Sequence, residues 1–287
     1  MSIGFALSSL EQGLIFAIMA LGVFITFRIL DFADLSVEGS LPLGAAVSAR
    51  LIVAGINPVL SIFAAIIAGG IAGAITGILN TRLKIAPLLS GILTMTSLWS
   101  INLRIMGRPN IPLLGQKTLF SLVKLSYPWN NIIISLIFAL IFKFVLDCFL
   151  KTQLGFALRA TGDNPQMIRS MGVSTSTMKM IGLIVANAMV ALSGALVCQY
   201  QGFADVSMGI GTIIAGLASV IVGEVLVGEH SIFITTLGVI IGSIVYRFSI
   251  SFALTLGFNA SDLKLLTALL VLIFLSTPRI KNMFGGS

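Results

Sequence analysis

Apolar stretches of about twenty residues follow one another along almost the whole chain, and this feature restricts the fold more than any other. They cover residues 11–30, 35–55, 58–80, 86–106, 130–150, 179–200, 209–228, 231–252 and 262–278. A helix of twenty residues is about 30 Å long, which matches the hydrocarbon core of a bilayer. The pattern therefore predicts transmembrane helices.

The low content of charged residues points the same way. Only 9% of the residues are charged, against about 25% in a soluble domain, so this chain cannot cover a water-facing surface. The ten-residue alternation of a transmembrane β-barrel does not occur in the sequence. We expect an all-α integral membrane protein with about nine transmembrane helices, within a range of eight to ten. These helices are expected to form a single transmembrane domain over residues 1–287.

The basic residues of the loops predict the orientation of the chain. With nine spans, nine Lys and Arg residues lie on the side of the C-terminus and six on the other side. Cytoplasmic loops carry the excess of positive charge in membrane proteins. We therefore expect a multi-pass protein with its N-terminus outside and its C-terminus in the cytoplasm.

Composition and motifs exclude several other classes of protein. The same loop bias accounts for the net charge of +7, and no basic cluster with interleaved aromatic residues indicates a nucleic-acid partner. Cys148, Cys198 and His230 have no metal-ligand spacing, and residues 115–118 (GQKT) lack the glycine pattern of a nucleotide-binding loop. We expect no enzyme activity, no metal site and no cofactor bound by this chain.

The second apolar stretch carries carboxylates and a proline. Asp31, Asp34 and Glu38 have the spacing of one helical face, with Glu38 deepest in the membrane. Pro42 lacks the N–H group that would bond to the carbonyl of Glu38. We therefore expect the second span to break at residues 38–42, and broken helices at membrane depth line cavities.

This expected break gives the candidate translocation path. Its residues in the second span are Ser36, Glu38, Gly39, Ser40 and Pro42. A plainer interpretation stays open, in which Glu38 is a structural carboxylate tied to another helix through Arg50 or Asn80.

Three further features concern packing and charge. Gly69, Gly73 and Gly77 recur every four residues and predict close helix packing. Glu224 lies in the seventh stretch and is added to the candidate path, facing either an axis between two subunits or an inner gate. Arg247 is expected near the outer surface, in an interfacial ion pair with Asp262.

The long inner loop over residues 151–178 contains signals for a short helix. Asn164 followed by Pro165 predicts a helix start, and Gly172 predicts its end. The apolar residues between these positions, Met167, Ile168 and Met171, fall on one side of the helix. The short amphipathic helix favours docking to a protein, with a position flat on the lipid surface as the alternative.

This loop resembles the coupling loop of the permeases for branched-chain amino acids and ribose. The family pattern is carried here by Thr152, Gly155, Arg159, Ala160, Gly162, Asn164 and Gly172. In that family the helix inserts into a groove of a separate ATPase subunit. The resemblance implies that the coupling residues are Asn164, Pro165, Met167, Ile168, Arg169, Met171 and Gly172.

The resemblance covers most of the chain. Residues 31–49 look like the Asp-Leu-Ser-Val segment of the family, and residues 242–257 and 262–274 look closest to permeases linked to tyrosine or tryptophan uptake. The resemblance implies that the chain is the permease subunit of a binding-protein-dependent ABC importer in a bacterial-type inner membrane. The implied solute is a small one such as an amino acid, and aromatic amino acids are favoured over others.

The implied partners are a cytoplasmic ATPase that uses ATP, an extracytoplasmic solute-binding protein, the lipid bilayer and a second copy of this chain.

Two other functional hypotheses remain at this stage. A secondary transporter driven by an ion gradient would also use a broken helix and Glu38, but it has no need for a docking helix. A membrane scaffold without transport would have no use for acidic residues at a helix break.

Overall fold

A computed structural model describes residues 3–122, 129–228 and 231–257 of the chain, together with residues 265, 267–269 and 272. The helices are α1 (Ile3–Val23), continued by the π-helix η1 (Phe24–Ile29), α2 (Val37–Val53), α3 (Pro58–Thr81), α4 (Pro87–Met106), α5 (Leu119–Leu122), α6 (Trp129–Lys151), α7 (Gln153–Asp163), α8 (Pro165–Ser170), α9 (Thr175–Gln201), α10 (Thr212–Val227) and α11 (Ile232–Thr255). Two short antiparallel strands, β1 (Asn110–Pro112) and β2 (Phe203–Asp205), complete the described elements.

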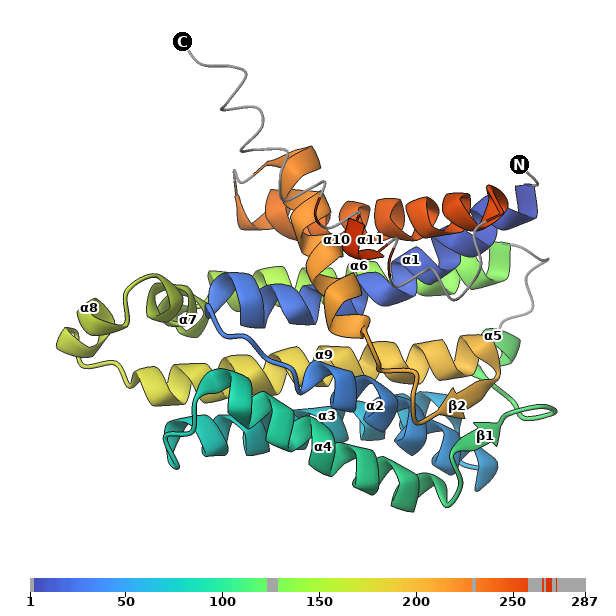
Figure 1. Ribbon diagram of the computed structural model, residues 1–287, viewed down its shortest axis with the longest axis horizontal. Coiled ribbons are helices and arrows are strands. Elements are labelled where there is room, and N and C mark those ends of the chain that lie inside the picture. Colours follow the sequence, from blue (N-terminus) through green and yellow to red (C-terminus); the bar gives the residue numbers. More distant parts are fainter. Residues whose placement is uncertain are drawn as a thin grey trace, which may run out of the picture.

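The long helices run between two ends of the molecule (Figure 1). At one end lie α7 and α8; at the other lie β1, β2, α5 and the start of α1. We call these the coupling end and the hairpin end. Each predicted apolar stretch up to residue 252 falls on a helix, whereas the last one, 262–278, lies mostly outside the described residues.

Five of the described helices are long and apolar enough to cross a membrane: α1 with η1, α3, α6, α9 and α11. The chain is thus a multi-pass membrane protein. Helix α4 has 20 residues but is more polar, and α2 and α10 have 17 and 16. At 1.5 Å per residue, α2 and α10 are about 25 Å long, less than a full crossing. Both begin near the middle of the bundle (Figure 1).

The break in the second span lies earlier than predicted. Helix α2 begins at Val37 and continues through Pro42, so residues 38–42 are helical and the break precedes them. Asp31 has a positive φ of 49°, and residues 31–34 have no regular structure. Asp31, Asp34 and Glu38 therefore do not share a helical face: Asp31 is exposed, whereas Asp34 is buried.

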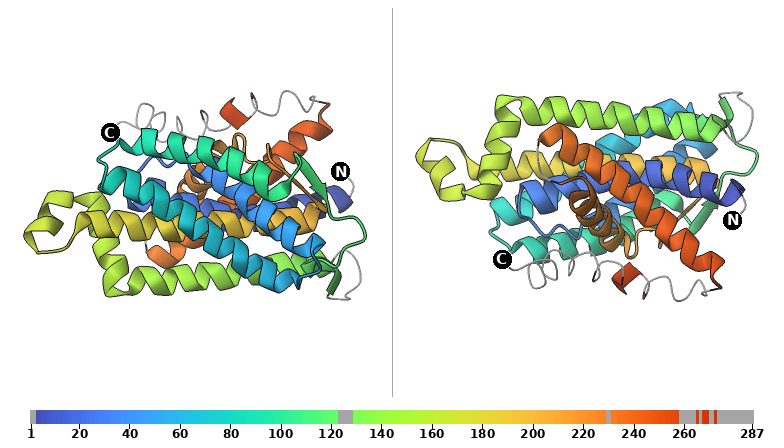
Figure 2. Two further views of the ribbon diagram at one scale, coloured as in Figure 1. Left: turned by 90° about the horizontal axis from the view of Figure 1, so that it is seen from below. Right: turned by 90° about the horizontal axis from the view of Figure 1, so that it is seen from above.

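Helix α9 is the centre of the bundle and packs closely against α2 and α3 (Figure 2). A Cβ on Gly73 of α3 would lie 2.2 Å from the carbonyl oxygen of Leu183, and one on Gly194 of α9 would lie 2.0 Å from that of Leu41. The predicted stripe of small residues on α3 thus lets two backbones touch, which is how helices associate in lipid.

The loop between α6 and α9 contains two helices, not the one predicted. Helix α7 precedes the expected α8, and its N-cap Thr152 accepts a hydrogen bond from the backbone of Gly155. Asn164 caps α8 by accepting a hydrogen bond from Met167 N at 3.0 Å, and Gly172 ends it with a φ of 83°. Helix α8 thus begins directly after Asn164 and ends before Gly172.

Residues 107–122 form part of a cover at the hairpin end. Ile111 pairs with Ala204, and the backbone N–H of Leu119 donates to the buried Gln199 of α9 at 2.8 Å. Residues 123–128 of this loop lie outside the described part of the chain.

The close contact of α3 with α9 gives a direct test. We expect Gly73→Ala to lower the thermal unfolding midpoint in detergent, because the added methyl group has to separate the helices at a cost of about 1–3 kcal/mol. Gly70→Ala is the matched control, since its Cβ would meet only the Ile184 side chain, at 3.6 Å. Equal midpoints for the two variants would contradict this packing.

Candidate functional site

The N-termini of the two short helices meet inside the bundle. Gly211, the N-cap of α10, donates its backbone N–H to Oε1 of Glu38 in the first turn of α2, at 2.9 Å. Gly211 has a φ of 81°, which a residue with a side chain rarely adopts. The positive ends of two helix dipoles thus converge on one carboxylate at membrane depth.

A buried polar network holds the start of α2. Asp34 Oδ1 accepts hydrogen bonds from the backbone N–H of Ser36 at 2.9 Å and from its hydroxyl at 2.5 Å. Its other oxygen accepts one from Nδ2 of Asn187 in α9, at 2.9 Å. Ser40 donates to Oδ1 of the same asparagine at 2.6 Å. These four residues are at most 2% exposed. Their hydrogen bonds to one another satisfy polar groups at the helix break that would otherwise need water as a partner.

The carbonyl of Glu38, which Pro42 leaves without a helical N–H donor, faces the turn before α10. A Cβ on Gly209 would lie 1.9 Å from this carbonyl oxygen and 2.7 Å from Cδ of Pro42. Only a glycine fits there. The proline therefore does not break α2; it makes the place where the turn before α10 packs against it.

Two cavities open on either side of this meeting point, and both are lined by Glu38 and Ile210. The first, the α4 cavity, has a volume of about 450 Å³ and lies between α2, α4 and the turn before α10. Its other lining residues are Gly39, Pro42, Met95, Thr96, Trp99, Asn102 and Val206.

The second, the α11 cavity, has a volume of about 510 Å³ and is bounded by α1, α10 and α11. Besides Glu38 and Ile210, its lining includes Phe16, Thr212, Tyr246, Arg247 and Thr267.

Helix α4 carries exposed polar residues in its second half. Thr96, Ser97, Ser100 and Arg104 are all exposed, and three of them recur every fourth residue on one face. Thr96 and Ser97 donate to carbonyls of their own helix, as hydroxyls do in an apolar medium. A polar face on a helix of 20 residues within this bundle indicates contact with water or protein rather than with lipid.

The glycines of the coupling loop allow close approach to the bundle. A Cβ on Gly155 would lie 2.3 Å from the carbonyl oxygen of Phe149 in α6, and one on Gly162 would lie 1.9 Å from that of Ile29 in η1. Helix α7 is therefore pressed against the ends of two long helices. Movement of this loop would be transmitted directly to them.

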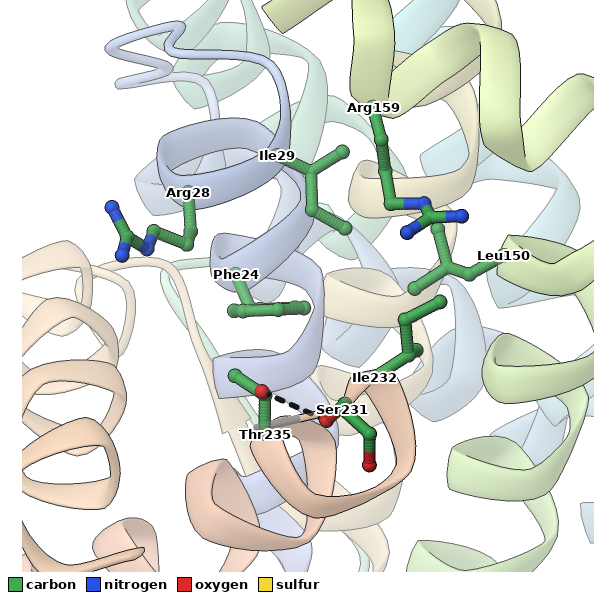
Figure 3. A pocket seen from close by; sticks show the side chains of 8 residues that line it. All are labelled: Phe24, Arg28, Ile29, Leu150, Arg159, Ser231, Ile232 and Thr235. Atoms are coloured by element: carbon green, nitrogen blue, oxygen red, sulfur yellow. Dashed lines mark hydrogen bonds between the residues drawn. The ribbon is translucent and has the colours of Figure 1, made fainter. Parts of the chain in front are cut away.

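A pocket of about 250 Å³ lies at this junction (Figure 3). Arg159 of α7 points into it beside Leu150, while Ser231 and Thr235 enter from the start of α11 (Figure 3). Nε of Arg159 is buried and has no hydrogen-bond partner within the described residues. The pocket joins the coupling loop to the bundle.

The apolar side chains of α8 do not all face outward as predicted. Met167 and Met171 are 50% and 69% exposed. Ile168 is only 3% exposed, and its buried side chain attaches the helix to the rest of the protein. Ile168 is therefore wrong as a contact residue for a partner, because a six-residue helix must bury one side chain to stay attached. Arg169 is exposed and donates to Thr175 of α9 at 2.9 Å.

The structure brings most of the predicted path residues together but separates one of them. Ser36, Glu38, Gly39, Ser40 and Pro42 share the start of α2. Glu224 lies elsewhere, in an ion pair at 2.9 Å with Arg28 of η1. Its role at an inner gate stays a prediction.

Sequence reasoning missed several residues of the site. Asn187 stands out only as an amide within an apolar stretch, and Gly209 and Gly211 resemble ordinary loop glycines. Arg247 was assigned to the outer surface but lies within α11. Asn80, one of the two partners expected for Glu38, donates its side-chain amide to the carbonyl of Ile85. In the part of the chain that the structure describes, no three His, Cys, Asp or Glu residues are placed to hold a metal ion.

Comparison with known proteins gives consistent results. Residues 5–276 match the family described as the permease component of branched-chain amino acid transport systems. The chain is 47% identical to a tyrosine transport system permease protein of Clostridioides difficile (strain R20291), over 96% of this chain and 91% of the relative. It is 29% identical to a ribose import permease protein of Bacillus subtilis (strain 168), over 82% and 73%.

Two solved structures share the fold. One is PsaBC from Streptococcus pneumoniae in complex with Fab, with a TM-score of 0.56, 14% identity and coverage of 95% of this chain and 91% of the other. The other is a metal-chelate type ABC transporter in an inward-facing conformation, with a TM-score of 0.50, 16% identity and coverage of 96% and 85%.

The hydrogen-bond network around Asp34 can be tested by substitution of Asn187 and by swapping the two side chains. We expect Asn187→Leu to lower the stability of the purified protein by about 3 kcal/mol, because the buried carboxylate loses a hydrogen-bond donor. Asn187→Asp should be as damaging, since it places two carboxylates together.

The double variant Asp34→Asn/Asn187→Asp keeps one carboxylate and one amide, and should recover part of the loss in thermal unfolding in detergent. A double variant no more stable than Asn187→Asp alone would show that the two residues do not act as a pair.

Proposed function

We propose that the chain, which belongs to the family of permease components of branched-chain amino acid transport systems, serves a binding-protein-dependent importer of a small solute, namely an amino acid, with aromatic amino acids favoured. At the coarser level it is an ABC transporter permease subunit, a component of membrane transport rather than a catalytic enzyme. The ion-gradient alternative receives no support from these comparisons.

The observation that carries the proposal is the meeting of α2 and α10 at Glu38. Two short helices that begin at membrane depth create a polar point within an apolar bundle, with a cavity on each side. Such discontinuous helices form solute sites in transporters. A purely structural bundle would gain nothing from this arrangement, because a carboxylate at membrane depth is costly.

The α4 cavity suits an aromatic solute. Met95, Trp99, Val206 and Ile210 give it a largely apolar lining, with Glu38 at its inner wall. Trp99 is 41% exposed, so its ring is available for stacking. The relative from Clostridioides difficile, named as a tyrosine permease, supports the same class of solute.

We further infer that two copies of the chain pair across the exposed polar face of α4. The face containing Thr96, Ser100 and Arg104 would then line a path between the copies. In this arrangement the hairpin end faces the outer side, where a solute-binding protein delivers the solute, and the coupling end faces the cytoplasm. The N-terminus would lie outside, since α1 starts at the hairpin end (Figure 1).

The proposed contact with the ATPase is the outer surface of α7 and α8. Four large apolar side chains are at least half exposed there: Leu154, Phe156, Met167 and Met171. The ATPase subunit would bind and hydrolyse ATP, and this chain would bind no cofactor. The close packing of Gly155 and Gly162 would pass the movement of the ATPase on to α6 and η1.

Co-purification tests this docking surface. We expect Met167→Asp/Met171→Asp to abolish co-elution with the cognate ATPase, because two exposed apolar contacts become charged. Leu114→Asp is the matched control: Leu114 is 88% exposed but lies after β1 at the hairpin end. Unchanged co-elution of the double variant, with the thermal unfolding midpoint of the wild type, would exclude α8 as the docking element.

Cysteine cross-linking tests the pairing of two copies. In a variant with Cys148 and Cys198 replaced by serine, Ser100→Cys should give a cross-linked dimer in membranes after treatment with a short bifunctional thiol reagent. Ile71→Cys is the control, because Ile71 is 58% exposed on α3, among apolar residues that suit lipid. Equal yields from the two positions would argue against a paired interface at α4.

ATP-driven uptake of L-tyrosine tests the function as a whole. Proteoliposomes that contain the permease, its ATPase and its binding protein should accumulate labelled L-tyrosine only when ATP is supplied on the ATPase side. Uptake that depends on a proton or sodium gradient instead of ATP would overturn the importer proposal.

A further inference from the structure

A pocket with a basic lining lies at the coupling end, between the turn that joins α3 to α4, helix α8 and the start of α9 (Figure 1). Its volume is about 410 Å³, and we call it the basic pocket. Three of its lining residues are cationic: Lys84 from the turn, Arg169 from α8 and Lys179 from α9. Its described lining residues include no carboxylate.

The three cations of the basic pocket have no acidic partner in the part of the chain that the structure describes. Among the described residues, none of them forms an ion pair. Arg169 donates from Nε to the hydroxyl of Thr175 at 2.9 Å, and its two Nη atoms are left for a further acceptor. Like charges around one pocket repel one another, and an anion between them would turn this repulsion into attraction. The lining therefore suits an anionic ligand.

The start of α9 adds hydrogen-bond donors to the basic pocket. Thr175 and Ser176, the first two residues of this 27-residue helix, line the pocket. The first backbone N–H groups of a helix have no acceptor within it, and the positive end of the helix dipole lies there. Cationic side chains together with such N–H groups are the usual partners of phosphate oxygens in proteins.

The backbone of Lys84 indicates that its side chain matters. Its φ is 54°, in the left-handed region that glycine and asparagine adopt more easily than lysine. Asn80 donates its side-chain amide to the carbonyl of Ile85 at 2.8 Å and thereby fixes the turn around it. A costly backbone at a fixed position is evidence for a functional side chain.

The outer face of α3 indicates where the anion comes from. Ile67, Ile71, Ile75 and Ile78 recur every three or four residues on this helix and are between 40% and 64% exposed. Leu83, next to Lys84 in the turn, is 63% exposed. An apolar face of this kind suits acyl chains, and it leads to the turn that lines the basic pocket. Basic pockets between transmembrane helices on the cytoplasmic side bind the head groups of anionic lipids.

We propose that the basic pocket binds the phosphate group of an anionic phospholipid, with Lys84, Arg169 and Lys179 around the phosphate and the acyl chains along α3. In the proposed orientation this lipid belongs to the cytoplasmic leaflet. It would join α8 to the turn between α3 and α4, and so hold the short helix against the bundle. The inference goes beyond the proposed function, because it requires neither an identified solute nor the ATPase.

The experiment measures lipid binding to the full chain, purified in detergent, by native mass spectrometry. Dioleoylphosphatidylglycerol and dioleoylphosphatidylcholine are titrated in parallel, since both carry a phosphate but only the first has a net negative charge. The wild type should bind the glycerol lipid at least about tenfold more tightly. Inorganic phosphate in excess, at constant ionic strength, should not displace it, because free phosphate lacks the acyl chains.

The variants remove charge at the basic pocket or elsewhere. Lys84→Met/Lys179→Met should weaken binding of dioleoylphosphatidylglycerol by about tenfold or more. Lys117→Met/Lys151→Met is the matched control: it removes the same charge from two exposed lysines that do not line the pocket, and should bind like the wild type. Arg169 is left unchanged, because it belongs to the surface proposed for the ATPase.

A second variant covers the case in which the double variant does not fold. Lys84→Asn alone suits the left-handed backbone and removes one charge, so it should fold and lose part of the lipid affinity. Thermal unfolding midpoints without added lipid are measured for every variant, so that a misfolded protein is not counted as a loss of binding.

Four outcomes would overturn the inference. Equal affinities of Lys84→Met/Lys179→Met and of its control would show that the pocket does not hold the lipid. Equal affinities of the wild type for the two lipids would exclude recognition of the anionic charge. Displacement of the lipid by inorganic phosphate would assign the pocket to free phosphate. Loss of co-elution with the ATPase, at unchanged lipid affinity, would assign the three cations to the ATPase.

Failure of the proposed function gives a different result. The lipid titration contains no solute and no ATPase, so a chain that imports no amino acid would still show the expected difference between the two lipids.

Discussion

The buried carboxylate of Asp34 is the interaction on which the arrangement of this bundle depends. It allows the chain to leave a helix at the end of η1, cross the interior in an extended form, and begin α2 at membrane depth. Backbone groups without partners are not tolerated there, so the N–H groups at the start of α2 need an acceptor. Asp34 supplies it, and Asn187 of α9 holds Asp34 in place. The second short helix, α10, follows the same principle with Glu38 as the acceptor.

Close backbone contacts give the network its rigid surroundings. Gly44 and Gly194 bring α2 and α9 together, and Gly69 and Gly73 do the same for α3 and α9. In lipid these contacts replace the hydrophobic effect as the source of helix association. Because α9 carries both Asn187 and the facing glycines, one helix fixes the position of the break and the depth at which Glu38 lies.

The two ends of the molecule differ in a way that suits transport driven from one side. At the coupling end, α7 presses on α6 and η1 through Gly155 and Gly162, with exposed Met167 and Met171 next to it. At the hairpin end, β1 and β2 cover the helices with a small sheet (Figure 1). Between them lie two cavities that share Glu38. A force applied to α7 thus has a direct path of packed backbone toward the helices around the cavities.

The sequence by itself determined that this is a helical membrane protein, and it placed the long apolar helices up to residue 252. Apolar length and low charge fix these features locally, whereas the family was indicated by the resemblance of the motif from Thr152 to Gly172. It also identified Ser36, Glu38 and Pro42 as one group. It did not locate the break, because the choice between a kink at Pro42 and a start at Val37 depends on Asn187, more than 140 residues away in the chain.

Only the tertiary structure decided that Gly209 packs on the carbonyl left free by Pro42, that Ile168 is buried, and that Arg247 lies in the wall of a cavity with Glu38. These facts depend on contacts between helices that are distant in sequence, and no local pattern of residues records them.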